Sequence, residues 1–260
     1  MKKGLIFSLL TISISTFSQT YISKVPAFVP NEKLSYVASY NMKGLMTELA
    51  GVDMEVTDVP GKKKPVYRLK FTANTLTSWD DYVKVRHAYQ TYIDPSSLKP
   101  LIMAQDSDVK GVITKGKYTF KHKSNITTME ITKSDAPAIN RNLTINSNTY
   151  DIVSLIYLSR SLDYPAFKVG QKVPLSVAFL ERLIGFNIKY MGKETIKTKA
   201  MGTKECYKIA LVLNEKFIVE PNVSFIWLTA DANRVPVLIS TVYKEGKAQV
   251  ELTKFEGLKN

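Results

Sequence analysis

Two short segments of this chain, one in each half, are built in the same way. Residues 92–102 read Tyr-Ile-Asp-Pro-Ser-Ser-Leu-Lys-Pro-Leu-Ile, and residues 227–238 read Trp-Leu-Thr-Ala-Asp-Ala-Asn-Arg-Val-Pro-Val-Leu. In each, an apolar run led by an aromatic residue reaches an aspartate (Asp94 or Asp231), and a proline after a short polar stretch opens a second apolar run. Aspartate accepts hydrogen bonds from turn backbone, and proline is tolerated where a strand begins. The repeated element therefore predicts a strand–turn–strand joint in each half of a β-rich chain. Duplication and the reuse of one β-meander both explain it.

Alternation of apolar and polar residues extends this prediction to most of the chain. Residues 67–73 place Tyr, Leu, Phe and Ala on one face and Arg, Lys and Thr on the other, and residues 82–93 continue with the same period of two. A period of two is typical of a half-buried strand. We expect further strands at residues 34–40, 42–59, 117–122, 125–133, 172–181, 186–198, 205–213, 223–229, 235–243 and 248–255.

One segment, residues 149–163, has helical spacing instead. Its apolar residues recur at intervals of three and four, so that Ile152, Leu155 and Ile156 share one face. Thr149 or Asn148 is the expected N-cap, and Asp151 is expected in the first turn. Because further apolar residues widen this surface, the helix is expected to lie in or against a strongly curved sheet.

The expected fold is mainly β: a single large curved antiparallel sheet, a half-barrel or open barrel, with one or two helices packed in or against its concave face. Residues 1–18 resemble a secretory signal peptide, because Lys2 and Lys3 precede an apolar run too short to span a bilayer. We expect residues 19–260 to form a single β-rich domain, since no linker rich in glycine, serine or proline divides them. The expected location is the periplasm, without lipidation, because no cysteine follows the apolar run.

The chain is basic, with a formal net charge of +13. In an exported protein we expect no nucleic-acid partner. The dispersed lysines suit solvated strand faces that discourage edge-to-edge pairing, or an attraction to an anionic surface. The lone Cys206 cannot form an internal disulfide, so the fold is expected to rest on its apolar core, and the mature chain is expected to be a monomer without a transmembrane segment.

A search for catalytic patterns finds no nucleophile elbow, metalloprotease motif, paired-cysteine motif or phosphate-binding glycine loop. We therefore expect no catalytic residues, no metal and no cofactor. His87 is expected to be a core or interface histidine, and Asp80-Asp81 a turn. An enzyme would need a site without histidine or cysteine, for example Arg86 with Asp94.

Aromatic and aliphatic side chains remain as the candidate functional surface. A curved sheet that carries them can enclose an apolar ligand, or they can fill an ordinary core. The predicted ligand-binding residues are Tyr67, Phe71, Tyr89, Leu155, Tyr157, Phe225 and Trp227.

Several of these segments, taken in order, resemble a family of exported bacterial proteins, domain of unknown function 3108. The resemblance rests on residues 92–95 and 98–101, on Tyr150-Asp151 with Ser154 and Arg160, and on residues 227–237. His87 departs from the family pattern, which has an acidic residue there. The resemblance implies a curved antiparallel sheet similar to that of the periplasmic lipoprotein-localisation carriers, and hence lipid binding; this is an analogy of fold alone.

Two functions follow as expectations. The first is a non-enzymatic periplasmic protein that binds a lipid-like or acyl-chain ligand in the concavity of its sheet. The alternative is an envelope scaffold or adaptor that binds a protein or an acidic glycan through its basic face.

Overall fold

A computed structural model describes residues 21–23, 25–42, 44–60, 64–179, 181–213, 224–243 and 246–259. The expected signal peptide, residues 1–18, lies outside them. The described residues form one sheet of fifteen strands in the order β8-β7-β6-β5-β4-β3-β2-β1-β15-β14-β13-β12-β11-β10-β9. The strands are β1 (Lys33–Met42), β2 (Leu45–Asp58), β3 (Tyr67–Thr75), β4 (Val85–Asp94), β5 (Lys99–Val109), β6 (Val112–Lys121), β7 (Ile126–Lys133), β8 (Ala136–Thr144), β9 (Thr149–Tyr150), β10 (Lys172–Phe179), β11 (Arg182–Thr198), β12 (Gly202–Leu213), β13 (Ser224–Thr229), β14 (Pro236–Tyr243) and β15 (Gly246–Glu256).

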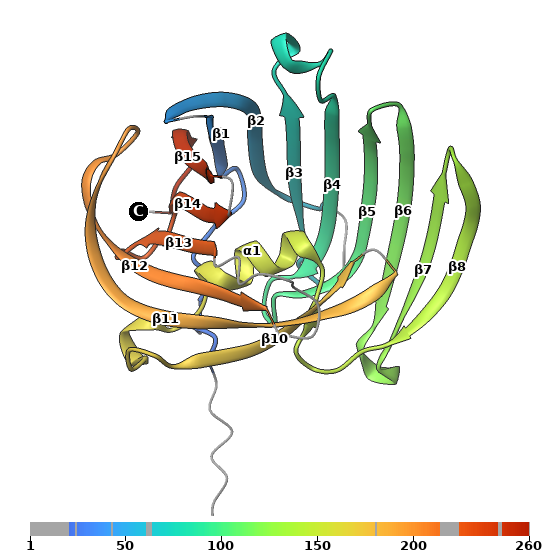
Figure 1. The fold of residues 1–260 in the computed structure, drawn as a ribbon. Helices are drawn as coiled ribbons and strands as arrows, with labels where there is room; N and C mark the ends of the chain where they lie inside the picture. The colour runs from blue at the N-terminus through green and yellow to red at the C-terminus, as the bar shows by residue number, and fades with distance from the viewer. Residues whose placement is uncertain are drawn as a thin grey trace, which may run out of the picture.

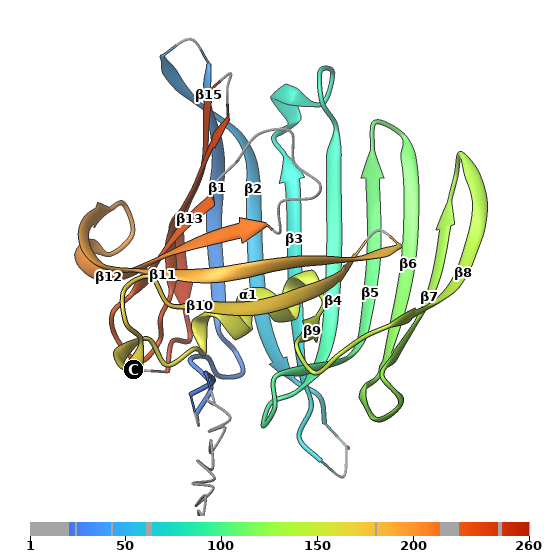
Figure 2. The same cartoon turned by 60° about the horizontal axis from the view of Figure 1, so that its bottom comes forward.

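The predicted fold class is confirmed, with one refinement. Fourteen strands form an antiparallel meander, whereas β9 pairs with β10 in parallel, so the sheet is mixed. Among the described residues the edge strands β8 and β9 do not pair with each other, and the sheet stays open. Figures 1 and 2 show β10, β11 and β12 crossing in front of the strands of the first half, with α1 (Ile152–Arg160) enclosed between the two layers.

Both copies of the repeated element form the predicted joints. The Oδ1 atom of Asp94 accepts a hydrogen bond from the Ser96 backbone N–H at 2.9 Å, and Oδ1 of Asp231 accepts one from the Asn233 N–H at 3.0 Å. Each turn then passes through a left-handed residue, Leu98 (φ 57°) or Arg234 (φ 44°). The two joints connect β4 to β5 and β13 to β14, and a β-bulge follows each turn.

The helix is shorter than predicted and begins at a different cap. Thr149 and Tyr150 belong to β9, and Asp151 is the N-cap: its carboxylate accepts hydrogen bonds from the Val153 and Ser154 N–H groups. The Ser154 hydroxyl accepts in return from the Asp151 N–H, which completes a capping box. The predicted caps, Thr149 and Asn148, are therefore wrong. The other helical turns among the described residues are the 3-10 segments η1 (Thr77–Trp79), η2 (His122–Ser124) and η3 (Tyr164–Ala166).

Two apolar clusters hold the layers together. The larger one packs the buried face of α1 (Val153, Tyr157 and Leu158) against β1–β4 on one side and β10–β13 on the other. The smaller one joins β5–β7 to the start of the second layer and centres on Met103, Tyr118 and Met129. Each large side chain buried in this way contributes about 1.5–3 kcal/mol. No helix in the described residues is long and apolar enough to cross a membrane.

Candidate functional site

The concave face of the sheet is the candidate site, and α1 lies on it. The helix contacts β3, β4 and β10. Its two faces differ in burial, because Val153, Tyr157 and Leu158 are fully buried while the stripe formed by Ile152, Leu155 and Ile156 is only half-buried. The stripe is the apolar face that helical spacing predicted, and it contains Leu155, a predicted ligand-binding residue. The structure leaves it partly exposed, since Phe28 and the buried strands occupy the other side of the helix.

Inward-facing side chains of the surrounding strands share this half-buried state. Tyr207 marks the inward face of β12 because its ring stacks on Tyr164 beside the helix, at 5.2 Å between centroids. Alternation then places Leu211 on the same face, and the β12–β13 register does so for Ile226. The apolar residues that stay half-buried on the concave face are Phe71 and Ala73 on β3, Phe179 on β10, Leu211 on β12, Ile226 on β13 and Val250 on β15. Like the stripe, they pack against the larger apolar cluster and stay partly exposed, and we call them together the concave apolar surface.

Aromatic rings line one side of this surface. Phe71 stacks on its cross-strand partner Tyr89 at 6.0 Å between centroids, and Phe179 meets Tyr89 edge-on at 6.4 Å. His87 lies next to Tyr89, with 3.2 Å between Nδ1 and the tyrosine oxygen. Burial lowers the pKa of His87, so the ring is neutral at pH 7 and adds an aromatic rather than a charged surface.

The structure brings three of the seven predicted ligand-binding residues to this surface and places the others elsewhere. Phe71, Tyr89 and Leu155 belong to it. Tyr67 lies on the same face but at the far end of β3, and Tyr157 is fully buried against Phe28, with ring centroids 4.7 Å apart.

Phe225 and Trp227 lie on the other face of β13. Both rings face the ammonium group of Lys208, at 5.1 Å and 4.9 Å from their centroids, and the Trp227 Nε1–H donates to Glu194. The curled end of the β11–β12 hairpin covers this face, where Lys199 forms an ion pair with Glu251 of β15. Both faces of β13 are thus covered, so alternation alone could not identify the concave one.

A buried polar network anchors the two ends of α1. At its N-terminus the Thr91 hydroxyl donates to the Asp151 carboxylate at 2.9 Å. At its C-terminus Arg160 binds Glu32 through both guanidinium Nη atoms, at 2.5 and 2.7 Å, and both side chains are fully buried. Sequence reasoning missed this pair, because its members lie 128 residues apart.

A cavity of mixed polarity lies beside the helix. It has a volume of about 450 Å³ and is lined by Tyr21, Ile22, Leu158, Leu162, Val173 and Leu175 together with Ser147, Asn148 and Tyr150. The Lys99 ammonium lies over the Tyr150 ring, 3.9 Å from its centroid, and donates to the Ser147 carbonyl. Burial lowers the pKa of Lys99 to about 8.

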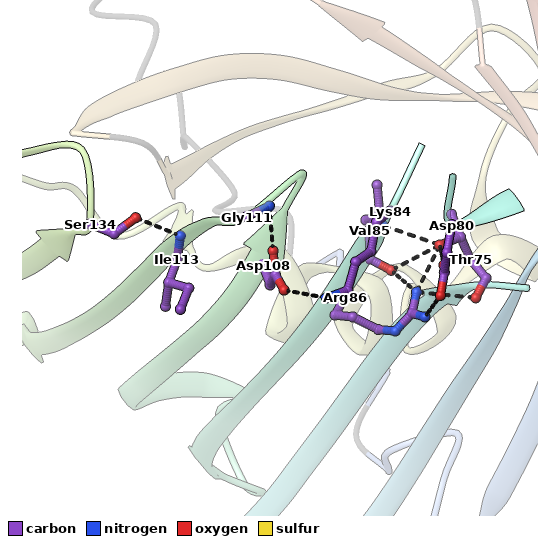
Figure 3. Close-up of polar contacts among 9 residues, drawn as sticks. All are labelled: Thr75, Asp80, Lys84, Val85, Arg86, Asp108, Gly111, Ile113 and Ser134. Carbon is purple, nitrogen blue, oxygen red and sulfur yellow. Dashed lines mark hydrogen bonds and ion pairs between the residues drawn. The ribbon is translucent and has the colours of Figure 1, made fainter. Parts of the chain in front are cut away.

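Arg86 and Asp94, the pair that an enzyme was expected to use, are not brought together. Arg86 lies at the opposite end of β4 from Asp94, and its Nη2 atom binds Asp80 Oδ2 at 2.5 Å instead (Figure 3). The proposed pairing of Arg86 with Asp94 is therefore wrong. Cys206 is fully buried, and burial raises the pKa of its thiol to about 11, so the thiol is protonated at pH 7. Within the described residues, no group of three or more His, Cys, Asp or Glu side chains is placed to hold a metal ion.

Comparisons with known proteins add the following. The family model of a protein of unknown function, DUF3108, matches residues 35–253. A β-barrel-like protein of domain of unknown function DUF1849 from Brucella abortus has a similar structure, with a TM-score of 0.60 and 12% identity; the match covers 92% of this chain and all of that one. This likeness shows the fold alone.

Two further solved structures are less similar to this chain in fold. An exported protein with a YmcC-like fold from Bacteroides fragilis has a TM-score of 0.33 at 11% identity, covering 89% of this chain and 100% of that one. A lipoprotein from Parabacteroides distasonis has a TM-score of 0.35 at 12% identity, covering 92% and 100%. No curated protein matches the sequence.

Proposed function

The chain belongs to the DUF3108 family of proteins of unknown function, and from this premise we propose that it is a non-enzymatic protein of the cell envelope that binds an apolar or amphipathic, lipid-like ligand on its concave face. The observation that carries the proposal is the half-buried stripe of α1. Ile152, Leu155 and Ile156 form a wholly apolar helix face that packs against the core and stays partly exposed. The N-terminal sequence, which resembles a signal peptide, supports a location in the cell envelope.

The chemistry of the surface favours an acyl chain over a polar ligand. The stripe and its neighbours on β3, β10, β12, β13 and β15 are aliphatic or aromatic, and the nearest polar group of the aromatic cluster, His87, is neutral at pH 7. Ligand sites of this kind are mostly apolar, with a few polar groups that orient the ligand. Contact with a chain would complete the burial of the stripe. Because these side chains are already half-buried, each would gain only part of the roughly 1.5–3 kcal/mol that full burial of a large apolar side chain contributes.

The proposal is tested with the fluorescent fatty acid cis-parinaric acid and with lipid extraction from the protein purified after export. Leu155→Asn places a polar group in the stripe and is expected to weaken parinarate binding by at least about tenfold. The matched control is Ile102→Asn, which removes an equally large side chain from the outer face of β5 and should leave binding unchanged.

Co-purification of lipid with the parent protein, and its loss in Leu155→Asn, supports the proposal. Equal parinarate affinity of Leu155→Asn and Ile102→Asn would show that the stripe takes no part in ligand binding. A parent protein that binds no parinarate and yields no lipid on extraction would refute the function itself.

A further inference from the structure

One end of the sheet carries most of the exposed apolar side chains. Of the fourteen large apolar side chains that are exposed in the described residues, nine lie at the turns that join β1 to β2, β3 to β4, β5 to β6 and β14 to β15. Leu45 and Tyr82 are each 72% exposed and Val242 is 55% exposed. We call this set the apolar rim; its members are Leu45, Met46, Leu76, Tyr82, Val83, Val109, Ile113, Val242 and Tyr243.

The rim is a consequence of the meander. Alternate turns of an antiparallel meander lie at the same end of the sheet, and β15 runs antiparallel to β1, with Ala248 opposite Tyr40. The β14–β15 turn therefore joins the turns of the first half. Figures 1 and 2 show these turns together at the upper end of the sheet.

The opposite end serves as an internal comparison. Three of its turns are polar: Pro95-Ser96-Ser97 after Asp94, His122–Ser124 between β6 and β7, and Ala232-Asn233 after Asp231. Phe255 is the exposed large apolar side chain at that end of β15. Exposed turns of this sheet can therefore be polar. The concentration of valine, leucine and tyrosine at one end is therefore a property of that end.

The rim turns are held in place by contacts between neighbouring strands. The Trp79 Nε1–H donates to the Glu48 carbonyl at 2.9 Å, which ties the β3–β4 turn to β2. Arg86 binds both Asp80 and the Thr75 hydroxyl, and Lys84 binds Asp108 at 3.0 Å, as Figure 3 shows. These contacts fix the β3–β4 and β5–β6 turns, which carry five of the nine rim residues.

The same contacts neutralise the carboxylates just behind the rim. The Arg86 guanidinium and the Lys84 ammonium hold the pKa values of Asp80 and Asp108 below their usual range, so both carboxylates are ionised and paired. Glu48 and Asp81 are exposed nearby, as are Lys110 and Lys247, so the rim is close to balanced in charge within a chain of net charge +13.

We propose that the apolar rim docks the protein on the surface of a phospholipid bilayer, where its side chains enter the headgroup region. The rim residues lie on separate turns. A folded protein partner would need a separate pocket for each turn, whereas a fluid lipid interface adapts to all of them. Two are tyrosines, Tyr82 and Tyr243, whose amphipathic rings suit the membrane–water boundary. The net positive charge favours approach to anionic lipid.

The fluorescence of a native tryptophan can report on binding at the rim. It contains two tryptophans, and Trp79 lies beside Tyr82 with ring centroids 5.9 Å apart, whereas Trp227 lies on β13. In a Trp227→Phe background, Trp79 reports on the rim. The protein is purified after export, so that no leader peptide partitions into lipid, and is mixed with vesicles of phosphatidylethanolamine and phosphatidylglycerol that contain brominated acyl chains.

The expected result is a blue shift and bromine quenching of Trp79, together with flotation of the protein with the vesicles. Leu45→Ser combined with Tyr82→Ser is expected to lower vesicle partitioning by about tenfold or more. The matched control, Ile102→Ser with Phe255→Ser, changes exposed apolar residues outside the rim and should partition like the parent.

Several outcomes would overturn the docking proposal: no flotation of the parent, equal flotation of the rim and control variants, or binding that high salt abolishes and the rim variant leaves unchanged. A rim that instead holds two copies or another protein together, and does not bind vesicles, would also overturn it. Parinarate affinity of the rim variant should equal that of the parent, which separates this proposal from the function of the concave face.

Discussion

Replacing Arg160 by methionine is the sharpest test of how the structure holds α1 in place. The guanidinium makes four hydrogen bonds: two to the Glu32 carboxylate, one to the Ala27 carbonyl at 3.2 Å and one to the Asn233 carbonyl at 3.0 Å. These contacts join the C-terminus of α1 to the segment before β1 and to the Asp231 turn.

The expected cost follows from burial. Arg160→Met leaves a carboxylate with no exposed surface and no counter-ion, and removal of one partner of a buried ion pair costs roughly 3–5 kcal/mol. Loss of the two carbonyl contacts adds about 1 kcal/mol each. We therefore expect a loss of about 5–7 kcal/mol, a large part of the 5–15 kcal/mol that stabilises an ordinary domain. The double variant Glu32→Gln/Arg160→Met removes the stranded charge and should recover about 2 kcal/mol or more.

The assay is urea unfolding followed by circular dichroism. Arg86→Met is the matched control, because the Arg86–Asp80 pair has the same 2.5 Å distance but its side chains are 31% and 26% exposed. A pair at the surface contributes about 0–1 kcal/mol. If Arg160→Met and Arg86→Met lose equal stability, or if the double variant is no more stable than Arg160→Met, the reasoning about burial is refuted.

Three further predictions concern single sites. Lys99 has a pKa of about 8 in the folded state against an ordinary value of 10.5, so the unfolded state binds the proton more tightly. The free energy of unfolding should therefore rise by about 1–2 kcal/mol between pH 8 and 10.5, after allowance for solvent screening. If urea titrations give the same difference in stability between the parent and Lys99→Met at every pH in this window, the prediction is contradicted. Asp151→Ala removes the N-cap and its bond to Thr91 and should lower the unfolding free energy by about 1–2 kcal/mol, whereas Asn148→Ala, at the cap predicted from sequence, should change it by less than about 0.5 kcal/mol. Gly257→Ala should lower the melting temperature by several degrees or more, because a Cβ at φ +66° would lie 2.3 Å from the Asn31 carbonyl oxygen, and an unchanged melting temperature would refute this contact.

The sequence predicted the strands where their burial differs between faces and missed them where it does not. Residues 67–73 alternate because one face of β3 is covered, and this strand was located correctly. Strand β8, Ala136–Thr144, was not predicted: it is an edge strand whose residues are almost all exposed, so no alternation marks it. The two-residue strand β9 is too short to carry any pattern.

The candidate site could be predicted only in part, for a geometric reason. Alternation separates the two faces of a strand but does not say which one is concave. Phe71 and Tyr89 lie on the concave face, which β3 and β4 bury. Trp227 lies on the other face of β13, which the β11–β12 hairpin covers as well. The capping box of Asp151 with Ser154 was readable from the sequence, since its two members lie three residues apart.

Several polar residues on which the resemblance to the family rests lie at the joints of the fold. Asp151, Ser154 and Arg160 fix the two ends of α1, and Asp94 and Asp231 close equivalent turns. Such residues preserve the position of the helix whatever the concave face binds.

The two Asp turns also relate the halves of the sheet to each other. In the strand order, β3-β4-β5 and β12-β13-β14 advance in the same direction. The last strand, β15, pairs with the first, β1, so the antiparallel strands run across the sheet from β10 to β15 and then from β1 to β8. Both Asp turns then lie at the same end, opposite the apolar rim. In the described residues, the four rim turns thus expose apolar side chains, whereas the two Asp turns at the other end are polar. A fold that needed only a core would gain nothing from this difference, whereas a protein that works at a lipid surface would present one end to it.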